Sequence, residues 1–358
     1  MKRTLIFLFV CFLCLNLSAC GSKPASAAAV NSFFEANFNN NYWFSGDFWA
    51  FDDTIFYLQD GMYNMGAYRR TNGSQELLFQ ESDFSEGNTT IGDIFVCDNF
   101  LYFELTEAQG TWLYRYNLEE GSYAPVCQAP ELYRWAVVDD YFIYREHPAN
   151  NEDKKSPLWV YNMLEGTAAQ VCADVEEFGI VDGQLRYITN VDDYELYQYD
   201  YAENHSAFLG KFYCEFDDAY DIFNFIPDGV VMLNWSNAYD RNLVVYSTSS
   251  DSTAVYTLPK GIHNLVACDQ YAYAVIYDTK KNSSTALPAE ENGIYRINLS
   301  DGSYEIVERN ADDGTEIHVV SDDCFYIVQR KMNLMFQAER HVYKYDHAAG
   351  SKEKLAVI

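Results

Sequence analysis

A short pattern recurs seven times between residues 50 and 326: an apolar run, a turn aspartate, and a second apolar run rich in aromatic residues. Consecutive turn aspartates are 41 to 53 residues apart. The seven turn aspartates are Asp52, Asp98, Asp139, Asp182, Asp228, Asp269 and Asp322. A repeat of about 45 residues made of short strands is typical of a β-propeller, in which each repeat forms one four-stranded blade.

The second half of each repeat predicts another hairpin. In LYRYNLEEGSYAPVC (113–127), the side chains of Leu113 to Tyr116 alternate with the period of two expected of a strand with one covered face. Glu-Gly, Asp-Gly and Asn-Gly pairs supply the positive φ that tight hairpin turns need. We therefore predict an all-β chain, a seven-bladed β-propeller with four antiparallel strands per blade. Six and eight blades are the alternatives.

The first residues have the features of an export signal. Lys2 and Arg3 precede an apolar core from Leu5 to Leu15, which is too short to span a bilayer stably. The signal ends in Leu17-Ser18-Ala19-Cys20, which matches a bacterial lipobox; an ordinary secretory signal with a chance cysteine is the alternative. The expected organisation is a signal peptide over 1–19, lipidated Cys20 and a flexible leash over 20–38, and one propeller domain over 39–358. Cys20 would anchor the chain by its lipid to the extracytoplasmic face of the bacterial cell membrane.

The chain is strongly acidic, with a formal net charge of −29. Nucleic acid and anionic lipid headgroups are poor partners for such a field, so we expect no nucleic-acid binding. Solubility is a simpler explanation of this acidity than cation binding. We expect a monomer without a cofactor.

Six of the nine cysteines remain after the signal and Cys20 are set aside. They show no paired spacing of the kind that metal sites use, and Cys97 and Cys268 occupy equivalent slots in different blades, too far apart to bridge. Small buried side chains in strand cores are expected. A disulfide that involves Cys214 stays open.

Propeller topology sorts the connections onto two faces. If the strands of a blade are a, b, c and d from the centre outward, the a–b and c–d turns share one face, here called the turn face. The b–c and d–a connections share the other, the loop face. The long connections all fall on the loop face: 81–92, 146–157, 211–225, 278–293 and 331–340. Function concentrates on loops carried by a rigid scaffold, so a site is expected there.

Candidate ligand-binding residues on the loop face are aromatic or basic. Trp135, Trp235 and Tyr239 are expected to be exposed and able to stack on sugar rings or anchor a protein partner, with core packing as the alternative. The basic candidates, which solvated loops would also explain, are Lys154, Lys155, Lys280 and Lys281.

No catalytic residue is assigned. The sequence has no Gly-x-Ser-x-Gly elbow, no His-Glu-x-x-His and no phosphate-cradling glycine loop. Acidic clusters at Asp217-Asp218-Asp221 and Asp312-Asp313 lack the alternating oxygens of a calcium loop, so no metal site is predicted.

The hairpins IYRINLSDGSYEIV (294–307) and LYRYNLEEGSYAPV (113–126) resemble those of lipoprotein-receptor-type β-propellers. The segment NNNYWFSGDFWAFDDTIFYL (39–58) resembles the first blade of bacterial surface domains of unknown function. The resemblance covers about residues 39–358 and implies the fold alone. The receptor propellers have six blades, and their Tyr-Trp-Thr-Asp signature is absent here, so the choice of ligand does not carry over.

The leading hypothesis is a membrane-anchored extracytoplasmic binding module that displays a ligand or protein site on the loop face. The alternative is a carbohydrate-active enzyme, a hydrolase or lyase, with its site at the mouth of the propeller funnel. A deep polar funnel with two convergent carboxylates about 5–10 Å apart would favour the enzyme. Exposed aromatic side chains without perturbed acids would favour binding.

Overall fold

A computed structural model describes residues 48–358, apart from 52, 61–64, 85–88, 131, 148–154, 191–192, 214–221, 234–241, 259–260, 278–290, 313, 321–323 and 333–337. These residues form 28 strands in seven four-stranded sheets and one short 3-10 helix, η1 (Glu81–Asp83). The predicted signal peptide, lipidation site and leash lie outside the described residues. No helix among those described is long and apolar enough to cross a membrane.

Each sheet consists of four consecutive strands paired antiparallel in chain order. The innermost strands a are β1 (Phe48–Phe51), β5 (Thr90–Cys97), β9 (Leu132–Val138), β13 (Glu177–Val181), β17 (Ile222–Ile226), β21 (Ile262–Cys268) and β25 (Thr315–Val320). The b strands are β2 (Thr54–Asp60), β6 (Phe100–Glu107), β10 (Tyr141–Glu146), β14 (Gln184–Asn190), β18 (Gly229–Leu233), β22 (Tyr271–Ile276) and β26 (Cys324–Met332).

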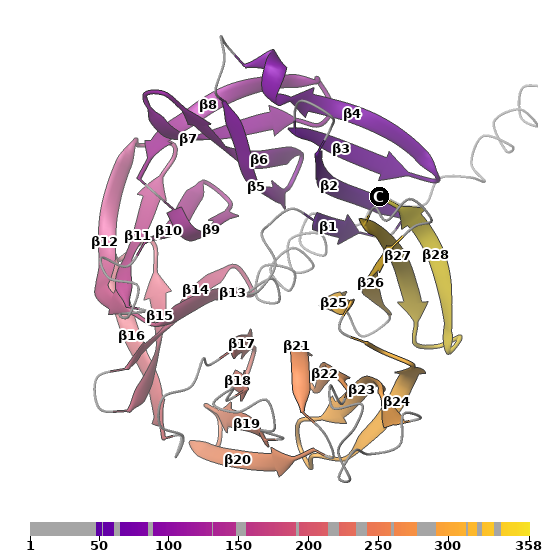
Figure 1. Ribbon diagram of the computed structural model, residues 1–358. Coiled ribbons are helices and arrows are strands. Elements are labelled where there is room, and N and C mark those ends of the chain that lie inside the picture. Colours follow the sequence, from indigo (N-terminus) through magenta and orange to yellow (C-terminus); the bar gives the residue numbers. More distant parts are fainter. Residues whose placement is uncertain are drawn as a thin grey trace, which may run out of the picture.

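The c strands are β3 (Met65–Thr71), β7 (Gly110–Asn117), β11 (Ser156–Asn162), β15 (Tyr194–Asp200), β19 (Asn242–Ser247), β23 (Gly293–Asn298) and β27 (Ala338–Asp346). The outermost strands d are β4 (Ser74–Gln80), β8 (Ser122–Ala129), β12 (Thr167–Val175), β16 (His205–Phe212), β20 (Ser252–Thr257), β24 (Tyr304–Arg309) and β28 (Ser351–Val357). Figure 1 shows the seven sheets arranged as a ring about one axis, with strands a at the centre. The prediction of seven four-stranded blades is confirmed.

Four of the repeated aspartates occupy left-handed backbone in their a–b turns, while Asp52 and Asp322 lie outside the described residues. Asp98, Asp139, Asp182 and Asp269 have φ between 31° and 51°. Short polar side chains that bond locally are the residues that tolerate this region, apart from glycine. In the fifth blade the positive φ passes to Gly229, which follows Asp228. The recurring aspartate is therefore a feature of the turn face.

The core lies between neighbouring sheets, where large aromatic side chains fill the space. Phe79 of the first blade stacks on Phe103 of the second at 4.2 Å between ring centroids. Trp49 packs against Phe95 across the same gap at 4.8 Å. Burial of such rings is the main stabilising contribution in a fold whose blades share no backbone hydrogen-bond ladder.

Among the described strands, none is exchanged between the first and last blades where the ring closes. The first blade consists of β1 to β4 and the last of β25 to β28, so closure depends on side chains. Phe48 and Ile55 of the first blade pack with Tyr326 and Val328 of the last. Arg340 Nη2 adds a hydrogen bond of 3.0 Å to the carbonyl of Leu58. We call this contact the closure seam.

The structure bears on two sequence expectations, the loop predicted over 331–340 and the state of the cysteines. The segment expected as a loop over 331–340 partly continues the sheet, because Lys331 pairs with Glu339 and Arg330 with Arg340. That part of the prediction was wrong. The described cysteines form no disulfide with one another; Cys97 is buried and four others are partly buried: Cys127, Cys172, Cys268 and Cys324. Cys214 lies outside the described residues.

Candidate functional site

The predicted ligand residues do not form one exposed patch. Trp135 is only 5% exposed and packs between Phe95 and Phe142, so the expectation of an exposed ring was wrong. Its slot on an innermost strand places the indole in the gap between two blades. Lys155 Nζ donates a hydrogen bond to the carbonyl of Asn190. The remaining candidates lie outside the described residues: Trp235, Tyr239, Lys154, Lys280 and Lys281.

A different set of residues occupies one register position of the innermost strands. In the strand register, four residues of strands a lie opposite the fifth residue of their b strands. These are Arg134 opposite Arg145, Glu177 opposite Ile188, Asn264 opposite Val275 and Glu316 opposite Val328. In the second blade the position falls to Asp93, inside a bulge opposite Glu104. In the fifth it is apolar, since Ile222 pairs with Leu233. We call the polar members the polar ring: Asp93, Arg134, Glu177, Asn264 and Glu316.

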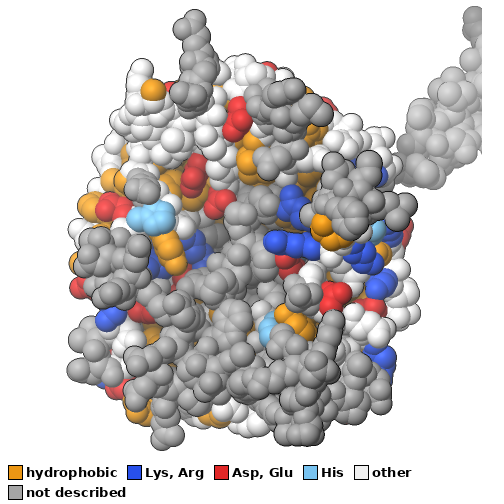
Figure 2. All heavy atoms as spheres, in the orientation of Figure 1, with side chains coloured by type: hydrophobic (Ala, Val, Ile, Leu, Met, Phe, Trp, Pro, Cys, Tyr) orange, Lys and Arg blue, Asp and Glu red, His pale blue; other side chains and the backbone are white. Residues whose placement is uncertain are grey.

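The polar ring lies toward the loop face. Strand a runs from the d–a connection to the a–b turn, and these residues stand near its start. Glu177 is the first residue of β13, and Glu316 the second of β25. Figure 2 shows basic and acidic side chains around the centre of the disc, over the innermost strands. The polar ring thus lies toward the face on which a site was predicted from the loops, but its residues stand on strands and not on loops.

In the third and fourth blades, Glu177 forms ion pairs with two arginines. Arg134 Nη1 lies 2.9 Å from Glu177 Oε1, and Arg145 Nη1 lies 3.7 Å from Oε2. Arg145 also donates to Ser156 Oγ at 3.1 Å and to the carbonyl of Glu176 at 2.6 Å. The side chains of Arg145 and Glu177 are 1% exposed and that of Arg134 is 12% exposed. Two guanidinium groups therefore share one buried carboxylate.

In the second blade, Glu104 is an unusual acid. Burial first, and the charge of Asp93 second, raise the pKa of Glu104 to about 8, against a smaller opposing effect of the Trp135 indole N–H. This N–H faces the carboxyl group but has no hydrogen bond of ordinary geometry. Gly92 leaves the space for the acid, since a Cβ there would lie 2.7 Å from Glu104 Oε2. Glu104 is consequently protonated at neutral pH beside an ionisable neighbour.

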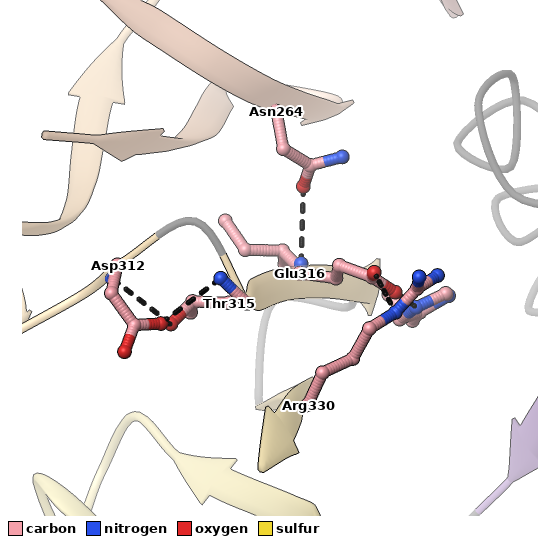
Figure 3. A network of polar contacts seen from close by, with 8 residues as sticks. Asn264, Asp312, Thr315, Glu316 and Arg330 are labelled. Atoms are coloured by element: carbon pink, nitrogen blue, oxygen red, sulfur yellow. Dashed lines mark hydrogen bonds and ion pairs between the residues drawn. The ribbon is translucent and has the colours of Figure 1, made fainter. Parts of the chain in front are cut away.

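In the last blade, Glu316 organises a third cluster, shown in Figure 3. Arg330 reaches from β26 with its Nε 2.9 Å from Glu316 Oε1, and His318 Nε2 is 3.4 Å from Oε2. Asn264 extends from β21, and its Oδ1 accepts from the backbone N–H of Ile317 at 3.0 Å. The side chain of Arg330 is 56% exposed, so this cluster reaches solvent.

Polar residues also connect neighbouring blades. Asn224 Oδ1 accepts a hydrogen bond from the N–H of Ala267 at 3.2 Å. In the next blade, Asn264 Oδ1 accepts in the same way from the N–H of Ile317. Such bonds satisfy the edge of an innermost strand, which has no further strand to pair with. Part of the polar ring is therefore structural, and this applies most clearly to Asn264.

The sequence carried a signal for this ring that was missed. Asp93, Arg134, Glu177 and Asn264 each stand five residues before the turn aspartate of their blade, in runs that are otherwise mostly apolar. Glu316 stands six before Asp322, because the register shifts between His318 and Val320. Comparison of the repeats position by position would have found the first four.

The acidic clusters considered for calcium do not form a metal site in the described part of the chain. Asp312 Oδ1 accepts from Thr315 Oγ1 at 2.9 Å and from the N–H of Gly314 at 3.1 Å, which makes it a turn residue. Asp217, Asp218, Asp221 and Asp313 lie outside the described residues. Among those described, no group of three or more His, Cys, Asp or Glu side chains is placed to hold a metal ion.

The chain matches no family model and no curated protein sequence. Its fold is similar to solved structures of peptidase β-propellers. A prolyl endopeptidase aligns with a TM-score of 0.59 and 12% identity over 94% of this chain and 52% of the other. The β-propeller domain of the Trilobed protease from Pyrococcus furiosus, described as having an open velcro topology, aligns at 0.56 with 9% identity over 87% and 97%.

An acylaminoacyl peptidase from Pyrococcus horikoshii aligns with a TM-score of 0.56 and 9% identity over 90% of this chain and 53% of its own. The chain thus spans about half the length of these two whole peptidases and nearly all of the isolated propeller domain. At such identities the likeness shows the fold alone. The β-propeller fold is common to this chain, which has seven blades, and to a peptidase domain, and the resemblance to receptor-type propellers stays a prediction.

Proposed function

We propose that this chain is a binding module whose site is the polar ring and its partners on the loop face. The observation that carries the proposal is the gathering of buried charges at one register position. Arg145 and Glu177 are each 1% exposed in a fold whose core is otherwise apolar and aromatic. Burial of charges costs stability unless they are well paired, so apolar residues would serve a purely structural seam at least as well.

The likeness to peptidase structures stands at 9–12% identity and shows the fold alone. It does not supply a substrate. Fold and function are separable in propellers, and the argument for binding therefore depends on the residues of the ring.

The proposal includes attachment to the extracytoplasmic face of a bacterial membrane by lipid at Cys20. Its support is the sequence from Lys2 to Cys20. Metabolic labelling with a fatty acid tests it: label should enter the full chain and be lost in Cys20→Ala. Label that persists in the variant, or a wild-type chain that takes up none, would refute the lipid anchor and leave the binding proposal unaffected.

The binding proposal is tested with the chain from Gly21 onward, which retains all 28 described strands. The immobilised chain is presented with peptides and oligosaccharides from a bacterial envelope, and bound species are identified by mass spectrometry. A ligand supports the proposal if Glu316→Gln weakens its capture and Arg69→Gln does not. Arg69 is the matched control because it pairs with exposed Glu76 at 2.6 Å, away from the ring. Capture that is equal in all three chains would refute a site at the ring.

One observation favours a second function, acid–base hydrolysis. Asp93 and Glu104 are a carboxyl pair of unequal environment, and the protonated Glu104 has the acidity of a general acid. A screen of glycoside substrates over pH 5–9 would decide. Turnover that is lost in both Glu104→Gln and Asp93→Asn would favour the enzyme, whereas a ligand captured without turnover would favour the binding module.

A further inference from the structure

The closure seam contains two buried hydrogen-bond donors that have no acceptor in the described part of the chain. Tyr57 of β2 is 0% exposed, and its hydroxyl group has no hydrogen-bond partner among the described residues. The Nε–H group of Arg70, on the neighbouring strand β3, is likewise buried without a described partner. A buried polar group costs stability when it is left without a partner, so an acceptor at this place would stabilise the fold.

Both donors project toward the last blade. In the pairing of β2 with β3, Tyr57 lies opposite Tyr68 and Ile55 opposite Arg70. Residues directly opposite each other share a face of the sheet, and every second residue of a strand returns to that face. Ile55 and Tyr57 pack against Val328 of the last blade, so this face is the one that lines the closure seam. Tyr57 and Arg70 therefore lie on the same side of the first blade.

The surroundings of the Tyr57 hydroxyl are positively charged. Burial, the largest effect, raises the pKa of Tyr57, and the charge of Arg70 opposes it. Tyr68 adds a smaller increase and Arg340 of the last blade a smaller decrease. Among the described residues, these influences include two arginines and no carboxylate. Arg70 itself forms no ion pair with any described residue, so its charge is available to an anion.

We propose that Tyr57 and Arg70 bind a chloride ion in the closure seam between the first and last blades. The ion accepts one hydrogen bond from the Tyr57 hydroxyl and one from the Arg70 Nε–H, and its charge offsets that of the guanidinium group. The site is separate from the polar ring and from the binding proposed there. Its role is to strengthen the contact at which the ring of blades closes.

The walls of the closure seam favour a small monovalent anion. Tyr57 packs with Val328 and Val342, so apolar side chains bound the space beside its hydroxyl. The outer oxygens of a sulfate or phosphate would find no donors against such walls, and a dianion costs more to desolvate. Arg70 is only partly buried, which gives a small ion a route from solvent.

The first test measures stability against chloride at constant ionic strength. The purified chain is unfolded with urea in mixtures of sodium chloride and sodium gluconate. If chloride binds only the folded state, the folding equilibrium constant should increase roughly tenfold when chloride reaches ten times its dissociation constant. Tyr57→Phe and Arg70→Gln should each lose this response. A wild-type chain that responds to chloride no more than Tyr57→Phe does would overturn the site.

Tyr57→Phe also distinguishes an ion from a bound water molecule. In gluconate the variant should be at least as stable as the wild type, because it removes a buried hydroxyl that has no partner. As chloride is added, the wild type should gain stability over the variant. A variant that is destabilised equally in both salts would show that something other than chloride satisfies the hydroxyl, and the site would be wrong.

Arg69→Gln is the matched control for Arg70→Gln. Arg69 is the preceding residue of β3, on the opposite face of the sheet, and it pairs with exposed Glu76 at 2.6 Å. This variant should keep the full response to chloride. Loss of the response in Arg69→Gln as well as in Arg70→Gln would mean that chloride acts on the general charge of the chain and not at the closure seam.

A readout on the unmodified chain avoids any failure of a variant to fold. Bromide resembles chloride in charge and size and scatters X-rays anomalously. Crystals grown in bromide should show an anomalous peak within hydrogen-bonding reach of the Tyr57 hydroxyl and the Arg70 Nε. The absence of a peak there overturns the site. A peak without any chloride response in solution also overturns it, because the ion then binds at crystal concentration only.

Discussion

The indole Nε1 of Trp49 donates a hydrogen bond of 2.5 Å to the carbonyl of Ile94, 45 residues further along the chain. This bond joins the innermost strands of the first and second blades within a buried region. Since neighbouring blades share no ladder, such side-chain bonds supplement the apolar packing that holds them together.

Trp49→Phe should therefore destabilise the chain by about 2 kcal/mol, from the lost hydrogen bond and the smaller ring. Urea denaturation followed by circular dichroism measures the change. Trp112→Phe is the control, because Trp112 Nε1 is buried without a hydrogen-bond partner among the described residues, so that only volume is lost. An equal loss in both variants would contradict the role of the bond to Ile94.

Glu104 predicts a pH dependence of stability. Its pKa rises from 4.5 to about 8 on folding, because of burial and of Asp93. The folded state therefore holds the proton more firmly than the unfolded state. The stabilisation is complete below pH 4.5 and is lost as the pH rises toward 8, by at most about 1.4 kcal/mol per pH unit.

Glu104→Gln should remove this loss, so the stability of the variant relative to the wild type should increase from pH 6 to pH 9. Denaturation at the two pH values measures the difference. Glu76→Gln, which removes an exposed acid that pairs with Arg69, should change little between them. Parallel pH profiles for Glu104→Gln and the wild type would show that Glu104 ionises normally.

The number and order of the blades could be predicted because the aspartate turn repeats in the chain itself. The length of β26 could not, since Lys331 continues a sheet only by pairing with Glu339 across the hairpin. A short polar segment is equally compatible with a loop or with a strand that extends beyond the core.

The polar ring lies toward the face on which a site was predicted, but it consists of residues other than those predicted. Aromatic residues make up 17% of the chain, so the sequence cannot separate the buried ring of Trp135 from an exposed one. The residues of the polar ring come to one register position through the pairing of strands a with strands b. In the last blade a register shift places Glu316 six residues before the turn aspartate instead of five. Only the strand pairing in the structure shows that Glu316 and Arg134 occupy the same register position.

The closure seam predicts sensitivity at Phe48. This side chain is 2% exposed, packs with the last blade, and lies 5.0 Å from the ring of His318 between centroids. Because no strand is shared across the seam, apolar contacts carry closure. Phe48→Ala should cost about 3–5 kcal/mol in the free energy of unfolding.

Leu164→Ala is the control for Phe48→Ala in the same denaturation experiment. Leu164 is 77% exposed, so its truncation should change the unfolding free energy by less than about 0.5 kcal/mol. A loss below about 1 kcal/mol for Phe48→Ala would mean that closure does not depend on this packing.

Gly229 predicts a steric requirement in the a–b turn of the fifth blade. Its φ is 145°, and a Cβ there would lie 2.0 Å from the carbonyl oxygen of Tyr246 on the paired strand β19. Because the obstacle is backbone, β18 and β19 would have to separate. Gly229→Ala should therefore cost about 3 kcal/mol or more, from backbone strain and from the disturbed pairing.

The comparison that isolates the clash is Gly73→Ala. Gly73 also has a positive φ, 81°, but nothing lies within 4 Å of the position of its Cβ. Only the cost of left-handed backbone applies there, about 1–2 kcal/mol. Urea denaturation of both variants should show the larger loss at Gly229. Equal losses would mean that β19 gives way easily, and that glycine is required at this turn for its backbone conformation alone.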